Sequence, residues 1–296
     1  MKKIIWTGCV ALLCTVTHAQ ELYVNTEPAS NMAKGSMGFR VLSKLYQMKY
    51  DMSYSGYRIE PELMLGINRN WMIHFAGYGS NMYQKKFRAE GGSVYAKYRI
   101  YSEDEVHKHF RIAAFSAIAV IDNPTQLKIE SKMNVPDGNG GFTGQVYTSY
   151  YNSDEFDLNG NNSGIAAGLV GTKLVNKFAA SASVSYGYRL NNVNNKVGTG
   201  QPLHAVNYST SLGYLLLPRN YVGYDQTNVN VYVEVTGTTF PGNRKYYTDL
   251  APAVQFIFKS IARLDLSYRT QLMARAQRLS NNFFMLRLEY NLLNAF

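Results

Sequence analysis

An alternation of apolar and polar residues with a period of two runs through most of the chain, and it limits the possible folds more than any other feature. Between Phe178 and Arg189, alternate positions hold Phe, Ala, Val and Tyr, while the positions between them hold Ala, Ser, Gly and Arg. Successive side chains of a β-strand point to opposite faces, so this segment is predicted to be a strand with one apolar and one polar face. The same alternation recurs at 93–100, 205–216, 228–236 and 264–275.

Weaker segments with the same period bring the number of predicted strands to twelve. They lie near 36–46, 56–66, 71–83, 90–100, 109–122, 163–175, 178–190, 204–217, 227–238, 249–259, 263–275 and 282–296. No segment of comparable length has the 3.6-residue period of an amphipathic helix, and no change in composition marks a second domain. The sequence therefore predicts an all-β fold.

Two all-β folds have alternating strands, namely a secreted soluble β-sandwich and a closed antiparallel transmembrane β-barrel. A mean hydropathy of −0.23 fits both, because half of the strand residues of a barrel face a polar lumen. Beyond residue 19 there is no run of 18 apolar residues, so no membrane-spanning helix is predicted. Tyrosines at strand ends and an even strand number favour the barrel of about twelve strands, since only a closed sheet pairs every backbone group within lipid.

The first 19 residues have the order of parts that a secretory signal peptide has. Lys2 and Lys3 precede an apolar stretch at 4–16, and Ala19 is the small residue at the expected cleavage position. A membrane anchor is the alternative, but it needs roughly 20 apolar residues. The two cysteines of the chain lie inside the predicted signal, so disulfides and catalytic thiols are excluded after cleavage. Three parts are predicted: signal peptide 1–19, a periplasmic N-terminal lead-in 20–35, and the barrel 36–296.

The final strand resembles the closing strand of bacterial outer-membrane β-barrel proteins. It carries Phe284, Leu286, Leu288, Tyr290 and Leu292 at alternating positions, and Phe296 ends the chain. This resemblance implies a porin-like barrel in the outer membrane, in contact with its lipid. The resemblance also implies that the barrel-assembly machinery recognises the end of the chain, with Tyr290 and Phe296 as the assembly signal. The surplus of basic residues is expected to contact lipopolysaccharide phosphates through Arg and Lys.

The connections between the predicted strands divide into short and long ones. The connections 67–70, 176–177 and 260–262 are short and are expected on the periplasmic side, while 123–162 is the longest and is expected outside. By analogy with general porins, whose third outer loop folds inward, 123–162 is expected to constrict the lumen. The alternative is that part of it pairs as a hairpin that extends the wall to fourteen strands. The lead-in is expected either to enter the lumen or to lack order.

Charged residues on the polar strand faces are expected to line the lumen, because an Arg or Lys that faces lipid at the midplane costs about 2–4 kcal/mol. The candidates are Arg40, Lys44, Arg58, Glu60, Glu62, Lys97, Arg99, Arg111, Lys173, Arg189, Glu234, Asp265, Arg269, Arg275, Arg287 and Glu289. They are expected either to form cross-strand ion pairs that fill the barrel or to line an aqueous path. The net charge of +10, which becomes +8 when Lys2 and Lys3 leave with the predicted signal peptide, favours anions in any such path.

The remaining motifs predict no catalysis and no cofactor. A serine nucleophile needs an adjacent base, and no His-x-Ser pair of the outer-membrane phospholipase type occurs. The crowded residues Glu103, Asp104, Glu105, His107 and His109 are expected to form a solvated turn rather than a metal site. Nucleic acid is excluded by the compartment. The sequence therefore predicts a passive channel or transporter for small solutes that prefers anions, and the alternative is a non-conducting barrel with a structural, adhesive or interaction role.

Overall fold

The computed structural model describes residues 23–51, 54–105, 108–136, 142–220 and 225–296, and strands form all of the regular structure within these ranges. The predicted signal peptide lies outside the described residues. The strands are β1 (Ser36–Met48), β2 (Gly56–Gly66), β3 (Trp71–Ser80), β4 (Arg88–Glu105), β5 (Lys108–Ile121), β6 (Gln126–Pro136) and β7 (Phe142–Asn152). They continue with β8 (Gly164–Val175), β9 (Phe178–Arg189), β10 (His204–Leu217), β11 (Asn228–Phe240), β12 (Lys245–Phe258), β13 (Ala262–Ala274) and β14 (Ser280–Leu292).

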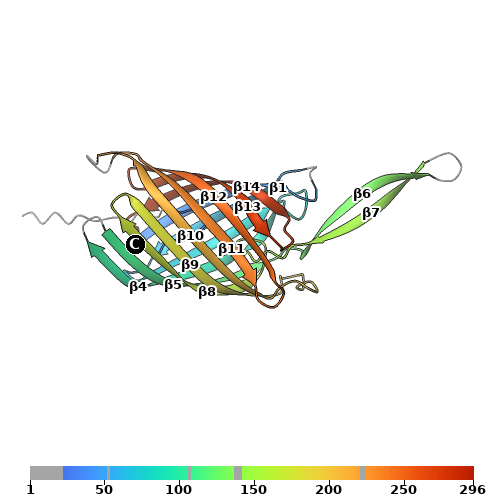
Figure 1. Ribbon diagram of the computed structural model, residues 1–296, viewed down its shortest axis with the longest axis horizontal. Helices are drawn as coiled ribbons and strands as arrows, with labels where there is room; N and C mark the ends of the chain where they lie inside the picture. The colour runs from blue at the N-terminus through green and yellow to red at the C-terminus, as the bar shows by residue number, and fades with distance from the viewer. Residues whose placement is uncertain (1–22, 52–53, 106–107, 137–141, 221–224) are drawn as a thin grey trace, which may run out of the picture.

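Twelve of these strands close into one antiparallel barrel in the order β1-β14-β13-β12-β11-β10-β9-β8-β5-β4-β3-β2 (Figure 1). The barrel closes where β1 pairs with β14, with Met37 opposite Leu292 and Lys44 opposite Met285. Each of the twelve predicted strands corresponds to one strand of the wall, so the predicted all-β barrel is confirmed. The largest difference is at β4 and β5, which continue the ladder through residues predicted as a long turn, with Glu105 opposite Lys108.

The two ends of the barrel differ. We call the end that holds Ser36 and Leu292 the terminal end, and the opposite end the loop end. The connections 67–70, 176–177 and 259–261 lie at the terminal end and are short. Asn176 has a φ of 53°, a left-handed conformation that suits the tight turn between β8 and β9. The long connection between β5 and β8 lies at the loop end, as predicted from the alternation of short and long connections.

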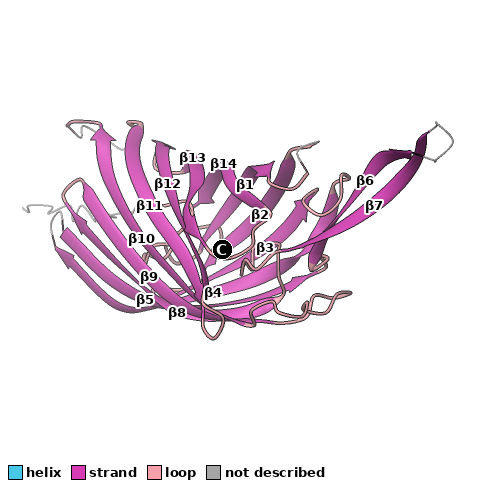
Figure 2. Cartoon of the chain, turned by 45° about the vertical axis from the view of Figure 1, so that its right-hand side comes forward, coloured by secondary structure: helices cyan, strands magenta, loops and turns pink. Residues whose placement is uncertain are grey.

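Most of that long connection forms a separate hairpin of β6 and β7, which projects from the loop end and, beyond its base, stands clear of the barrel (Figures 1 and 2). At the base Leu127 is buried against the barrel, and the rings of Tyr50 and Tyr151 are 4.1 Å apart. The hairpin pairs only with itself, from Gln126 opposite Asn152 to Pro136 opposite Phe142. The alternative of a fourteen-stranded wall is therefore wrong, because β5 and β8 pair directly with each other and leave no place for it. The expectation of an inward constriction is wrong for the hairpin. Only the segment that follows it, residues 153–163, returns to the lumen.

The outer wall is apolar. Its exposed side chains include Phe39, Val41, Phe75, Val94, Ile118, Ile165, Leu169, Val184, Leu212, Leu266, Phe284 and Leu288. Aromatic rings lie on this face near the terminal end, where Tyr214 is opposite Phe178 and the rings of Trp71 and Tyr98 are 4.9 Å apart. An apolar belt with an aromatic border is what lipid contact requires of a barrel wall.

A search of the described residues for helices finds none that has the length and apolar character needed to span a membrane.

Candidate functional site

The N-terminal segment, residues 23–35, lies inside the barrel. The carboxylate of Glu234 on β11 accepts hydrogen bonds from the backbone N–H groups of Asn25 at 3.0 Å and Thr26 at 2.9 Å. It also accepts one from the side-chain amide of Asn25 at 2.8 Å. Glu234 is fully buried, so these donors compensate a charge that has been removed from water.

The other half of the N-terminal segment is held on the far wall. The ammonium group of Lys97 on β4 donates to the carbonyl oxygens of Pro28 at 2.7 Å and Ser30 at 2.6 Å. The Glu27 carboxylate lies 3.4 Å from Lys97 and 3.3 Å from Arg40. Because β11 and β4 are nearly opposite in the strand order, the segment crosses the lumen from wall to wall.

A second segment enters from the loop end. We call residues 153–163 the returning segment. The guanidinium of Arg58 forms an ion pair with Glu90 at 2.9 Å and donates to Asn159 O, Gly160 O and Asn161 Oδ1 at 3.2, 3.2 and 2.7 Å. Gly160 has a φ of 102°, and a Cβ there would lie 2.9 Å from Arg58 Nε, so only glycine fits.

Two further arginines bind the beginning of the returning segment. Arg189 on β9 donates to the backbone carbonyls of Asp154 at 2.8 Å and Glu155 at 2.6 Å. Arg278, just before β14, forms ion pairs with Glu155 at 2.7 Å and with Asp249 on β12 at 2.6 Å. The returning segment is thus fixed to the wall at both ends by charge-assisted hydrogen bonds.

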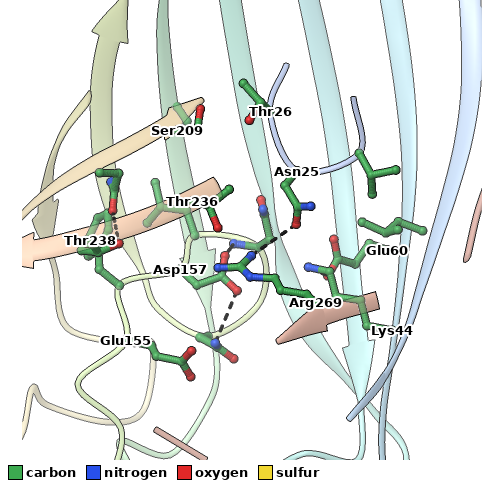
Figure 3. Close-up of a pocket in the computed structure, with 18 of the residues that line it drawn as sticks. Asn25, Thr26, Lys44, Glu60, Glu155, Asp157, Ser209, Thr236, Thr238 and Arg269 are labelled. Carbon is green, nitrogen blue, oxygen red and sulfur yellow. Dashed lines mark hydrogen bonds and ion pairs between the residues drawn. The ribbon is translucent and has the colours of Figure 1, made fainter. Parts of the chain in front are cut away.

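A chamber of about 380 Å³ remains between the two inserted segments. Figure 3 shows Asn25 and Thr26 of the N-terminal segment at one boundary and Glu155 and Asp157 of the returning segment at another. One wall carries uncharged hydrogen-bonding side chains from β9, β10 and β11: Ser183, Ser185, Asn207, Ser209, Thr236 and Thr238. The chamber also has five basic side chains, Arg40, Lys44, Arg269, Arg278 and Arg287, and five acidic ones, Glu27, Glu60, Glu62, Glu155 and Asp157.

Most of the predicted lumen charges lie on the inner face and are paired there. Arg40 bonds with Glu289 at 2.9 Å and Glu62 at 3.1 Å. The other wall pairs are Lys44 with Glu60 at 2.6 Å, Arg269 with Asp249 at 2.8 Å, Arg287 with Asp265 at 2.8 Å and Arg111 with Asp104 at 2.7 Å. Arg99 is half-buried near the terminal end, and its Nε is without a hydrogen bond among the described atoms. These contacts match the ion-paired interior, the first of the two expectations.

Two predicted lumen residues are on the wrong face or beyond the strand. Lys173 is exposed on the outer face of β8, whereas its neighbour Thr172 points inward and accepts a hydrogen bond from Ala29 N at 3.0 Å. Near a strand end, lysine can extend its ammonium to the membrane surface, so the penalty for facing lipid is small. Arg275 follows the last residue of β13 and is exposed, with its guanidinium 5.7 Å from the ring of Tyr246.

We expect Lys173→Leu to change the free energy of unfolding by less than about 1 kcal/mol, because the lysine has no buried partner to lose and lies near the membrane surface. Urea titration of the barrel in lipid vesicles measures this. A large loss of unfolding free energy would instead indicate that Lys173 faces the lumen. Lys97→Leu is the matched comparison, because it removes a buried cation.

Several lumen residues were missed by the sequence reasoning. Asp249 begins a predicted strand, and its inward face follows from alternation with Ala251 and Ala253, so the pattern could have identified it. Arg278 and Glu155 lie between predicted strands, and Glu27 lies ahead of them, so no periodicity applies. His74 on β3 points inward and its Nδ1 lies 2.5 Å from Glu62, but a single histidine gave no signal.

The residues predicted as a charged, solvated turn instead continue the ladder of β4 and β5, where Glu103, Asp104 and Glu105 are exposed. Asp104 lies 2.7 Å from both Arg111 and His109. Within the ranges that the structure describes, no group of three or more His, Cys, Asp or Glu side chains is placed to hold a metal ion. His107, part of the same sequence cluster, lies outside those ranges.

No protein-family model matches the chain, and no curated protein matches it. Solved structures do match. An outer-membrane channel of Pseudomonas putida F1 is similar with a TM-score of 0.55 at 12% identity, covering 91% of this chain and 100% of the channel. The NanC porin has a TM-score of 0.45 at 10% identity, covering 86% of this chain and 100% of the porin. The KdgM porin has a TM-score of 0.44 at 8% identity, covering 86% and 98%.

The likeness to the Pseudomonas channel concerns the fold, and it agrees with the features of the wall. The twelve-stranded closure, the apolar outer face and the polar interior are all those of a barrel that is surrounded by lipid. The chain therefore has the fold of the outer-membrane β-barrels.

Proposed function

We propose that the protein is a passive channel for small polar solutes, with the chamber as the middle part of its path. The observation that carries this proposal is the chamber itself, about 380 Å³ of space within a closed wall, lined by both polar and apolar side chains. The Pseudomonas channel with the same fold supports the proposal. No step of this function needs a catalytic group or a cofactor.

The charge balance of the chamber bears on its selectivity. The net charge of +10 suggested a preference for anions, but the chamber has five basic and five acidic side chains. Ion pairs within the wall leave little uncompensated positive potential for a permeating anion. We therefore propose weak charge selectivity. The reversal potential across a potassium chloride gradient in a planar bilayer measures it, and a value near zero is expected.

The N-terminal segment crosses the path, so conduction requires it to move. Thr26 Oγ1 lies 3.3 Å from Ser211 Oγ on β10, and both side chains are buried. The double variant Thr26→Cys, Ser211→Cys therefore places two thiols where they can form a disulfide. After removal of the predicted signal the chain has no other cysteine. We expect the oxidised variant to give no current steps in a planar bilayer, and a reductant to restore them.

The single variants Thr26→Cys and Ser211→Cys are the controls, and both should conduct in oxidising and reducing conditions. If the oxidised double variant conducts as well as the reduced one, the segment is not the barrier. If every variant is folded and silent, the channel proposal is wrong.

A second candidate function is a non-conducting barrel that makes contacts outside the membrane. Two observations favour it: the extensive ion pairing in the lumen and the β6–β7 hairpin, which stands clear of the wall. The bilayer experiment decides between the two, because a folded and silent protein selects this candidate.

We also propose that the end of the chain is the assembly signal. Tyr290 is exposed on the outer face of β14, and Phe296 is 65% exposed, so both rings are accessible to the barrel-assembly machinery. The exposed basic residues outside the wall are proposed to contact lipopolysaccharide phosphates.

A further inference from the structure

The lumen charges can be sorted by where their counter-charges come from. Most pairs join one wall strand to another, as for Arg287 with Asp265 at 2.8 Å and Lys44 with Glu60 at 2.6 Å. Such pairs stay intact whatever the N-terminal segment does. Glu234 and Lys97 are different, because the partners that compensate their charges belong to the N-terminal segment.

Glu234 makes no ion pair with any described lysine, arginine or histidine. Its carboxylate accepts hydrogen bonds from the backbone N–H groups of residues 24–26 and the Asn25 amide, and its one contact with the wall is Ser211 Oγ at 3.4 Å. Within the described part of the chain, Lys97 bonds only with Glu27 and with the carbonyl oxygens of Pro28 and Ser30. Both charged groups are fully buried under the segment.

Withdrawal of the segment therefore exposes one uncompensated anion and one uncompensated cation, on opposite walls. An ion that loses its partner in a poorly solvated site is strongly destabilised. A solute that supplies a cation to Glu234 and an anion to Lys97 removes this penalty, and it therefore favours the withdrawn state.

The segment itself gives the distance that such a solute must span. The N–H of Asn25 binds the carboxylate of Glu234. The Glu27 carboxylate and the Pro28 carbonyl bind the ammonium group of Lys97. These groups are two to three residues apart, which is roughly 7–11 Å in an extended chain. A tripeptide zwitterion has its ammonium and carboxylate groups at about this separation.

We propose that Glu234 and Lys97, with Arg40 beside Lys97, form a solute site for short zwitterionic peptides, which the N-terminal segment occupies until a solute displaces it. The inference rests on the proposed channel function and names the class of solute. The ammonium of the peptide takes the place of the backbone donors at Glu234. Its carboxylate takes the place of Glu27 at Lys97 and Arg40.

The test is displacement of the segment in the whole protein after removal of the predicted signal peptide, purified in detergent, so that Thr26→Cys supplies the only thiol. Thr26 is 5% exposed, so the thiol of Thr26→Cys should react slowly with a maleimide while the segment is in place. Triglycine is the probe. Its controls are N-acetyl-triglycine, which is only anionic, triglycine amide, which is only cationic, and N-acetyl-triglycine amide, which is neutral. We expect triglycine to raise the labelling rate about tenfold and the three blocked peptides to leave it within about twofold.

Variants in the Thr26→Cys background locate the effect. Glu234→Gln and Lys97→Met are each expected to abolish the response to triglycine. Lys173→Met on the outer wall and Glu130→Gln on the hairpin are the matched controls and should keep it. If Glu234→Gln or Lys97→Met does not fold, the comparison of the four peptides on the protein with Glu234 and Lys97 intact still tests the proposal.

The outcomes are separable from those of the channel experiment, because labelling does not require current. Equal acceleration by all four peptides, or acceleration by one of the singly charged peptides alone, overturns the zwitterion site. So does the absence of any effect of triglycine, even where the protein conducts. Acceleration by triglycine in a protein that never conducts supports the site and refutes the channel.

Discussion

Arg58→Met is expected to destabilise the barrel by about 3–5 kcal/mol, because it leaves a buried carboxylate without its partner. Arg58 is 0% exposed and pairs with Glu90 at 2.9 Å. The same guanidinium holds three oxygen atoms of the returning segment, so the variant also releases residues 159–161 from the wall. Methionine keeps most of the volume of the side chain, so the loss measured is chiefly that of charge and hydrogen bonds.

Urea unfolding in lipid vesicles, followed by tryptophan fluorescence, gives the free energy. The double variant Arg58→Met, Glu90→Gln should recover part of the loss, since it removes both charges. Arg275→Met is the control, because Arg275 is exposed beyond β13, and it should be neutral within about 0.5 kcal/mol. A loss below about 1 kcal/mol for Arg58→Met would show that water reaches this site freely and that the returning segment is not held there.

Leu169→Arg is expected to cost about 2–4 kcal/mol, because it places a cation on the lipid face near the middle of β8. Leu169 is 50% exposed and lies midway between Gly164 and Val175 on this strand. In water an arginine at an exposed position would be harmless. The penalty therefore measures lipid contact directly, and it would be absent from a soluble sheet.

Val175→Arg is the matched control, because it is on the same strand and face at the terminal end and is 39% exposed. Its cost should fall to about 0–1 kcal/mol, since the side chain can reach the membrane surface. Unfolding free energies in vesicles measure both variants. Equal and small costs at the two positions would contradict a membrane-embedded wall.

The wall was predictable from sequence because one of its faces contacts lipid and the other faces the aqueous lumen. Alternation at Phe178–Arg189 records lipid on one side and water on the other, and it fixes which residues point inward. The alternation is a weaker guide near the membrane surface, where a side chain on either face of a strand can reach water. Lys173 lies close enough to a strand end to reach the surface, and Arg275 lies beyond the strand, so polarity no longer indicates direction at either position.

The interior was less predictable, because its contacts join segments that share no period. The pairing of Arg58 with Glu90 and of Arg278 with Glu155 depends on how distant segments meet within the lumen. The hairpin is a different case. Lys128, Glu130 and Lys132 alternate with Ile129, Ser131 and Met133, so a strand pattern was present in the long connection. Its richness in Gly, Asn and Asp hid this pattern.

The closing ladder of the wall joins the first strand to the last, with Met37 opposite Leu292. The cylinder can therefore be completed only after nearly the whole polypeptide has been delivered to the membrane. Until that moment β1 and β14 are both bare edges, which readily pair with other chains. Contacts between such distant parts of a sequence also form slowly. Molecules that stop short of β14 keep an exposed strand edge, so we expect them to be the species most prone to aggregate.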